Sequence, residues 1–177
     1  MIKKLPLLLL LFAVQAVLAE KPQNYKVSVL REEYLEASKD EDVAVRFNKK
    51  MKDYEGDVPL VLAYKAASEA VMAKYVWNPY SKLKQLKAAA AIFEQAVEKD
   101  EDDPEIRFLR FTVEHYVPRY LNLSPNIEED KKVLINALKA HPKSGISPDL
   151  ARTMRDFMLT KDHSTPAEKK VLESIVI

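Results

Sequence analysis

Apolar residues recur three and four positions apart along most of the chain, which is the period of one face of an α-helix. The clearest stripe contains Leu83, Leu86, Ala90, Phe93 and Val97. Other segments repeat the pattern, and no window alternates apolar and polar residues for long enough to indicate a strand. The pattern therefore predicts an all-α fold, a small helical bundle of about seven or eight helices.

Helix starts are marked by prolines that directly follow a residue able to cap a helix. The side-chain oxygen of the cap accepts hydrogen bonds from free backbone N–H groups, and proline at the next position has no N–H to leave unpaired. Thr165 and Glu168 also have the spacing of a capping box. The cap–proline pairs are Asn78-Pro79, Asp103-Pro104, Ser124-Pro125, Ser147-Pro148 and Thr165-Pro166, with a looser version at Asp57-Val58-Pro59.

The segment 104–117 is predicted to be a helix with two apolar faces. Ile106 and Leu109 lie on one face, and Phe108 and Phe111 lie on the other. A helix that is apolar on both sides is expected at the centre of a bundle, with other helices covering both faces.

The same segment carries a narrow polar strip between its apolar faces, formed by Arg107, Arg110 and Glu114. Two guanidinium groups in a partly solvated strip suit a bidentate carboxylate or phosphate, which suggests a small anionic ligand. The alternative is structural: Arg110 pairs with Glu114 four residues on, and Arg107 pairs with an acidic neighbour. We favour the structural interpretation because a buried arginine is usually paired.

A second group of candidates surrounds the expected junction between the third and fourth helices. Tyr64, Lys65 and Lys82 could line a groove there, together with Asn78. The alternative is that Tyr64 belongs to the core, Asn78 caps a helix and the lysines are solvated.

The only tryptophan, Trp77, lies beside Tyr75 and Tyr80 at the end of the third predicted helix. An exposed aromatic cluster of this kind anchors a protein partner or a glycan. The alternative, which we favour from the sequence, is that the ring packs over the helix junction.

The histidines, His115, His141 and His163, form no spaced pair of the kind expected for a zinc site. His115 lies on an aromatic helix face and is expected to be a core histidine rather than a general base. No serine-nucleophile motif is present either. The sequence therefore predicts a protein without catalytic activity, without a cofactor and without a metal.

Composition excludes several classes of protein and of functional site. The chain has 177 residues, no cysteine, two glycines and a formal net charge of +1 at pH 7. That length suits one domain, and the absence of cysteine excludes disulfides, thiolate metal sites and a cysteine nucleophile. The near-neutral charge gives no bulk attraction to nucleic acid, so no nucleic-acid partner is expected.

Residues 1–19 have the pattern of a secretory signal peptide. Two lysines precede an apolar run, and Ala19 suits a signal-peptidase site before Glu20. The run is about 14 residues, shorter than the roughly 20 that a membrane-spanning helix needs. We therefore expect an exported protein, periplasmic or secreted after cleavage, whose mature chain of residues 20–177 is one helical domain without a transmembrane segment.

The spacing of Ala89, Phe93, Ala96 and Asp100 resembles the second helix of a tetratricopeptide repeat. An acidic turn and a new helix start at Pro104 follow, as at the boundary of such a repeat. The resemblance implies tetratricopeptide-like antiparallel hairpins within the bundle rather than a repeat array, which needs about three units.

A second resemblance rests on short segments between residues 59 and 140. These are Ala63-Tyr64-Lys65, Ala73-Lys74, Asn78-Pro79 with Lys82, Pro104-Glu105-Ile106-Arg107-Phe108-Leu109-Arg110-Phe111, Pro118 with Leu121, and Asp130-Lys131. Through them the chain resembles a family of uncharacterised exported helical proteins from Bacteroidota. This resemblance implies an exported location and a helical fold, and it implies no reaction.

Together these features predict a non-catalytic interaction or scaffold module of the bacterial cell envelope, whose partner is another envelope protein. The alternative is a periplasmic binding protein for a small anionic ligand, which Arg107 and Arg110 would hold.

Overall fold

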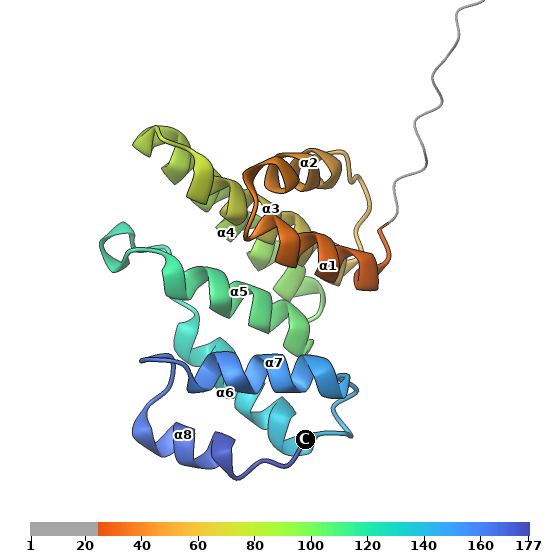
Figure 1. Ribbon diagram of the computed structural model, residues 1–177, viewed down its shortest axis with the longest axis vertical. Helices are drawn as coiled ribbons and strands as arrows, with labels where there is room; N and C mark the ends of the chain where they lie inside the picture. The colour runs from red at the N-terminus through yellow and green to blue at the C-terminus, as the bar shows by residue number, and fades with distance from the viewer. Residues whose placement is uncertain (1–24) are drawn as a thin grey trace, which may run out of the picture.

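The computed structural model describes residues 25–177, so the predicted signal peptide at residues 1–19 lies outside the described residues. The described chain contains eight α-helices, one short 3₁₀-helix and no strand, which confirms the predicted all-α fold (Figure 1). The elements are α1 (Val27–Ala37), α2 (Glu41–Lys52), α3 (Pro59–Tyr75), α4 (Pro79–Lys99), α5 (Pro104–Tyr116), η1 (Arg119–Leu121), α6 (Ile127–Ala140), α7 (Pro148–Leu159) and α8 (Pro166–Glu173).

Most of the predicted cap–proline pairs start helices as expected. The side chains of Asn78, Asp103, Ser147 and Thr165 each accept hydrogen bonds from backbone N–H groups in the first turn of the helix that follows. Thr165 and Glu168 form the reciprocal capping box. These starts could be predicted because a cap and its helix are adjacent in sequence.

The predicted helix start at Ser124-Pro125 is wrong by two residues, because α6 begins at Ile127 and no side chain caps it. The Ser124 hydroxyl donates instead to the backbone carbonyl of Glu114 at 2.8 Å. The backbone N–H of Asn126 donates to the Glu114 carboxylate at 2.9 Å. The segment before α6 is thus bound to the end of α5, which a local capping rule does not anticipate.

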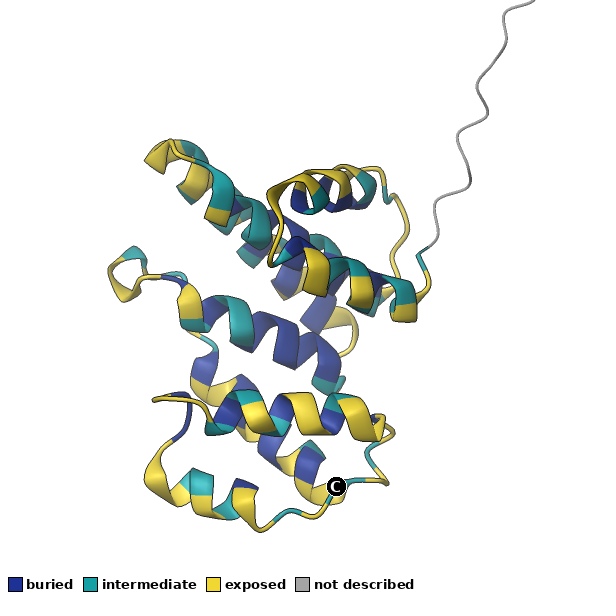
Figure 2. Ribbon diagram, viewed as in Figure 1, coloured by how far each residue is buried: buried dark blue, intermediate teal, exposed yellow. Residues whose placement is uncertain are grey.

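Helix α5 lies between the two halves of the molecule, with α1–α4 on one side and α6–α8 on the other (Figure 1). Ile106 and Leu109 belong to the apolar core formed with α1–α4. Phe108 and Phe111 belong to the second core, formed with α6–α8. The buried colouring of α5 in Figure 2 follows from this position, and the predicted central, two-faced helix is confirmed.

Helices α3 and α4 form the most extensively packed pair in the described chain, and three residues connect them. All buried residues of α4 lie at or after Ala89. The first turns of α4 therefore project from the body of the molecule, at the upper left of Figure 1. None of the helices within residues 25–177 combines the length and the apolar character needed to cross a membrane.

Candidate functional site

The strip on α5 that suggested an anionic ligand is occupied by an acidic residue of the protein itself. Asp130, on α6, is fully buried. Arg110 donates to its two carboxylate oxygens from Nε at 2.8 Å and from Nη2 at 2.7 Å. This bidentate pair is the geometry that a bound carboxylate would otherwise supply.

Both guanidinium groups make further hydrogen bonds inside the protein. Arg107 donates to Asp130 at 3.0 Å, to Glu129 at 2.6 Å and to the backbone carbonyl of Glu101 at 2.7 Å. Arg110 donates a further hydrogen bond to Glu94 at 3.0 Å. Both arginines are therefore internally paired, as the structural interpretation expected, and they are not free to hold a small anion.

Glu114 does not serve as the partner that the sequence assigned to Arg110. Its carboxylate accepts hydrogen bonds from the backbone N–H of Asn126 at 2.9 Å and from Asn126 Nδ2 at 2.8 Å. Burial raises the pKa of Glu114, although these two hydrogen bonds act in the opposite direction. Its role is to hold the segment before α6 against α5.

Tyr64 and Lys65 also make structural contacts. The Tyr64 hydroxyl donates to the buried Glu105 carboxylate at 2.7 Å, and Arg31 donates to both oxygens of the same carboxylate. Burial, with the nearby Glu105 charge, raises the pKa of Tyr64 well above its usual range. Lys65 donates to the backbone carbonyl of Tyr54 at 2.7 Å, which holds the loop between α2 and α3.

The structure does not bring Tyr64 and Lys65 together with Lys82. The two residues lie in the first half of α3, whereas Lys82 follows the turn at its other end. A helix rises 1.5 Å per residue, so Tyr64 and the end of α3 are about 17 Å apart. The prediction that one groove contains all three residues is therefore wrong.

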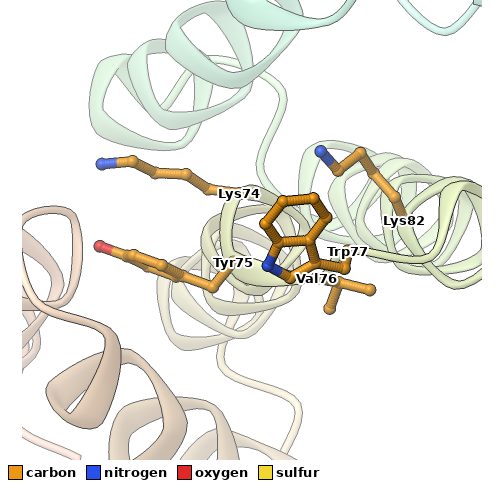
Figure 3. A pocket seen from close by; sticks show the side chains of 5 residues that line it. All are labelled: Lys74, Tyr75, Val76, Trp77 and Lys82. Carbon is orange, nitrogen blue, oxygen red and sulfur yellow. The ribbon is translucent and has the colours of Figure 1, made fainter.

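Of the candidate residues, Trp77 and Lys82 do share a site, at the turn between α3 and α4. A hollow of about 250 Å³ opens there (Figure 3). Trp77 is 97% exposed, so its predicted packing over the helix junction is wrong, and Tyr80 is 77% exposed. We call this region the Trp77 surface, and it comprises the lining residues of the hollow and Tyr80: Lys74, Tyr75, Val76, Trp77, Tyr80 and Lys82.

The local backbone accounts for the exposure of Trp77. Val76 ends α3 in an extended conformation, and the Asn78 side chain already caps α4 by accepting from Tyr80 and Ser81. Trp77 is the single residue between these two caps. It belongs to neither helix and has no core-facing position available.

The Trp77 surface is strongly basic. No acidic residue occurs between Glu69 and Glu94, and this interval contains Lys74, Lys82, Lys84 and Lys87. All of these lysines are exposed. The interval without acidic residues can be found in the sequence, but the net charge of the whole chain is near zero and does not indicate it.

A pair of histidines meets at the end of α5. The rings of His115 and His163 have centroids 4.1 Å apart, and His115 also contacts Phe111 and Phe157. The aromatic surroundings expected of His115 are therefore confirmed, but the residue is half-buried rather than part of the core. Burial and the neighbouring His163 lower the pKa of His115. The pair could not be predicted from sequence, because His163 lies in the distant α7–α8 loop.

Comparison with known proteins found no matching family model, no similar curated protein and no similar solved structure. Among the candidates, only the Trp77 surface combines exposure, aromatic character and unbalanced charge.

Proposed function

We propose that this protein is an exported, non-catalytic helical interaction module of the bacterial cell envelope, and that it binds an envelope protein through the Trp77 surface. The observation that carries the proposal is the exposure of Trp77, which is 97%. A large aromatic ring left in water loses the free energy that its burial would contribute. Tryptophan is also among the residues that contribute most to protein–protein binding.

The charges around Trp77 define the chemistry of the partner. Lys74 and Lys82 flank the hollow, and Lys84 and Lys87 continue the basic character along the exposed first half of α4. An acidic segment with at least one apolar side chain would match both properties, because complementary charge favours encounter and apolar contact favours retention. We therefore propose an acidic and partly apolar segment as the occupant.

Hydrogen bonds tie the end of α3, directly before Trp77, to the α1–α2 loop. Tyr75 donates to the backbone carbonyl of Ala37 at 3.2 Å, and Lys74 donates to the carbonyl of Ser38 at 2.8 Å. These bonds hold the end of α3 against the α1–α2 loop. A surface already held in place loses little conformational entropy when a partner binds.

Two parts of the proposal rest on sequence. The pattern of residues 1–19 supports export. The spacing of Ala89, Phe93, Ala96 and Asp100 supports a tetratricopeptide-like hairpin, and such hairpins commonly serve as binding scaffolds. The alternative, an anionic ligand held by Arg107 and Arg110, loses its support because Asp130 and other acidic side chains occupy both guanidinium groups.

Affinity capture from solubilised cell envelope tests the proposal. The test variants are Trp77→Ala and Lys82→Glu, and the matched controls are Tyr120→Ala, an exposed aromatic elsewhere, and Lys139→Glu, an exposed lysine on α6. We expect a specific envelope protein to be retained by the wild type and by both controls, and to be lost by both test variants.

Equal retention by Trp77→Ala and Tyr120→Ala would contradict the proposal, as would the absence of any specific envelope protein. Both substitutions remove exposed side chains, so each should change the free energy of unfolding by less than about 0.5 kcal/mol. A loss of capture can then be assigned to the surface rather than to unfolding.

A further inference from the structure

A second cluster of chemically active side chains lies far along the chain from the Trp77 surface. His115 lies in the last turn of α5, and Asp162 and His163 lie in the loop between α7 and α8. Each offers one ligand atom, and these atoms all lie within 4.8 Å of one another. In residues 25–177 this is the only group of three His, Cys, Asp or Glu side chains with such proximity.

His163 is held in the orientation of a metal ligand. Its Nδ1 lies 2.8 Å from the backbone carbonyl oxygen of Phe157. Because a carbonyl can only accept, Nδ1 carries the proton and the lone pair is left on Nε2. A hydrogen bond from the ring nitrogen that does not bind the metal, to a backbone carbonyl or a carboxylate, orients most metal-binding histidines.

His115 has an unused donor or acceptor in the same place. Its Nδ1 is buried and has no hydrogen-bond partner. An unsatisfied buried polar atom is costly, and a metal ion bound at Nδ1 would give this atom a partner. The ring of His115 faces that of His163 at an interplanar angle of 70°.

Asp162 is the acidic member of the cluster, and the turn directly before it has a defined conformation. Lys161 adopts a positive φ of 43°, a conformation that non-glycine residues rarely adopt. Lys169, on α8, donates to the backbone carbonyl of Lys161 and so holds this turn. The strained residue thus stands directly before two of the three candidate ligands.

We propose that His115, Asp162 and His163 form a binding site for a divalent transition-metal ion, with Zn²⁺ as the preferred ion. Two imidazoles and one carboxylate are a common set of three protein ligands for zinc, and they leave a fourth position for water. Ligand atoms on one tetrahedral zinc lie about 3.3 Å apart, so small side-chain rotations would complete the site.

Of two positively charged groups near the cluster, one is paired with acidic side chains. Arg119 and Lys131 are the positively charged groups that act on His115. Lys131 is itself paired with Glu128 at 2.9 Å and with Glu168 at 3.2 Å. The ion would link α5 to the α7–α8 loop, and it would stabilise the C-terminal half of the molecule.

Zinc titration of the untagged protein, expressed from its full sequence, tests the site. We expect isothermal titration to give one Zn²⁺ per chain, and Co²⁺ to produce visible absorption bands typical of four-coordination. Saturating Zn²⁺ should raise the melting temperature, because an ion that binds only the folded state stabilises it.

The variants distinguish this site from other sources of metal binding. We expect at least 100-fold weaker binding in His115→Gln and in His163→Gln, and at least 10-fold weaker binding in Asp162→Asn. His141→Gln and Asp102→Asn are the matched controls and should bind as the wild type does. Asp162 is exposed, so Asp162→Asn tests the site even if a histidine variant fails to fold.

Two results would overturn the proposal. One is the absence of saturable binding at millimolar Zn²⁺. The other is binding by Asp162→Asn and both histidine variants with wild-type affinity, which would place the ion elsewhere on the chain.

Discussion

Asp130 is the shared counter-charge of two buried arginines, Arg107 and Arg110. It is fully buried, and it lies 3.0 Å from Arg107 and 2.7 Å from Arg110. A buried charge is tolerated when its partners and hydrogen bonds are complete, and it is costly when one partner is removed. The outer acidic partners, Glu129 and Glu94, are half exposed and contribute less.

Replacing Asp130 should therefore be far more damaging than replacing its neighbour. We expect Asp130→Asn to lower the free energy of unfolding by about 3 kcal/mol, because two buried guanidinium groups lose their shared counter-charge. Glu129→Gln should cost less than about 1 kcal/mol, because that carboxylate is largely solvated. Urea denaturation of the two variants measures the difference, and equal losses would contradict the assigned role.

Glu168 predicts a pH dependence of stability. Burial alone would raise its pKa, but the hydrogen bonds from Thr165 and the contact with Lys131 hold the pKa below its usual range. The folded state therefore binds the proton less tightly than the unfolded state does. Its stabilising contribution is present above the unfolded pKa, near 4.5, and is lost as the pH falls through the lowered folded pKa.

We expect Glu168→Gln to be less stable than the wild type by up to about 1 kcal/mol at pH 7, and the difference to vanish below about pH 3. Urea denaturation at pH 7, 5 and 3 measures this dependence. A difference that is constant with pH, or that grows at low pH, would show that the carboxylate charge is not the cause.

Helix α5 is the element that joins the two apolar cores. Its Ile106 and Leu109 side chains lie in one core, and Phe108 and Phe111 lie in the other. A loss of packing on one face of α5 also weakens its hold on the other core, because the same helix supports both. Large-to-small changes on α5 should therefore affect the whole molecule.

Phe111→Ala tests this role. We expect it to lower the free energy of unfolding by about 3–5 kcal/mol, because Phe111 is fully buried in the folded protein and its removal leaves a cavity. Hydrogen exchange should show the loss in α3 and in α6 alike. Protection lost in α6–α8 but retained in α1–α3 would mean that the two halves unfold independently.

At the scale of the whole molecule, the sequence predicted the features that depend on neighbouring residues. The helix periodicity, the caps before Pro79, Pro104 and Pro166, and the two faces of α5 all follow from local spacing. Each is confirmed by the structure. A cap lies next to the helix it starts, and the spacing of an apolar stripe lies within one helix, so both can be recognised from neighbouring residues.

The features that depend on tertiary contacts could not be predicted in the same way. Asp130 is 20 residues from Arg110, and Glu105 is 74 residues from Arg31, so no local rule connects them. Arg110 was assigned to Glu114 because that carboxylate is one helical turn away. The exposure of Trp77 likewise depends on two caps that together leave one residue outside both helices.

The charge distribution is also a property of the whole molecule. A net charge of +1 conceals an interval from Glu69 to Glu94 that contains lysines and no acidic residue. The turn between α3 and α4 lies within this interval, and the start of α4 projects from the body of the molecule (Figure 1). The buried ion pairs involve α5 and α6, so the basic aromatic surface is separate from them. This separation favours a partner with acidic character.

The most direct test of the proposed binding surface uses the tryptophan itself. Trp77 is the only tryptophan in the chain, so protein labelled with 5-fluorotryptophan gives a single ¹⁹F resonance that reports on this surface alone. The resonance of the free protein should be narrow and close to that of an exposed indole. On addition of solubilised envelope we expect it to shift or broaden, and Lys82→Glu should abolish this response while Lys139→Glu retains it. A resonance that is unchanged by the envelope extract, or that responds equally in both variants, would contradict the account.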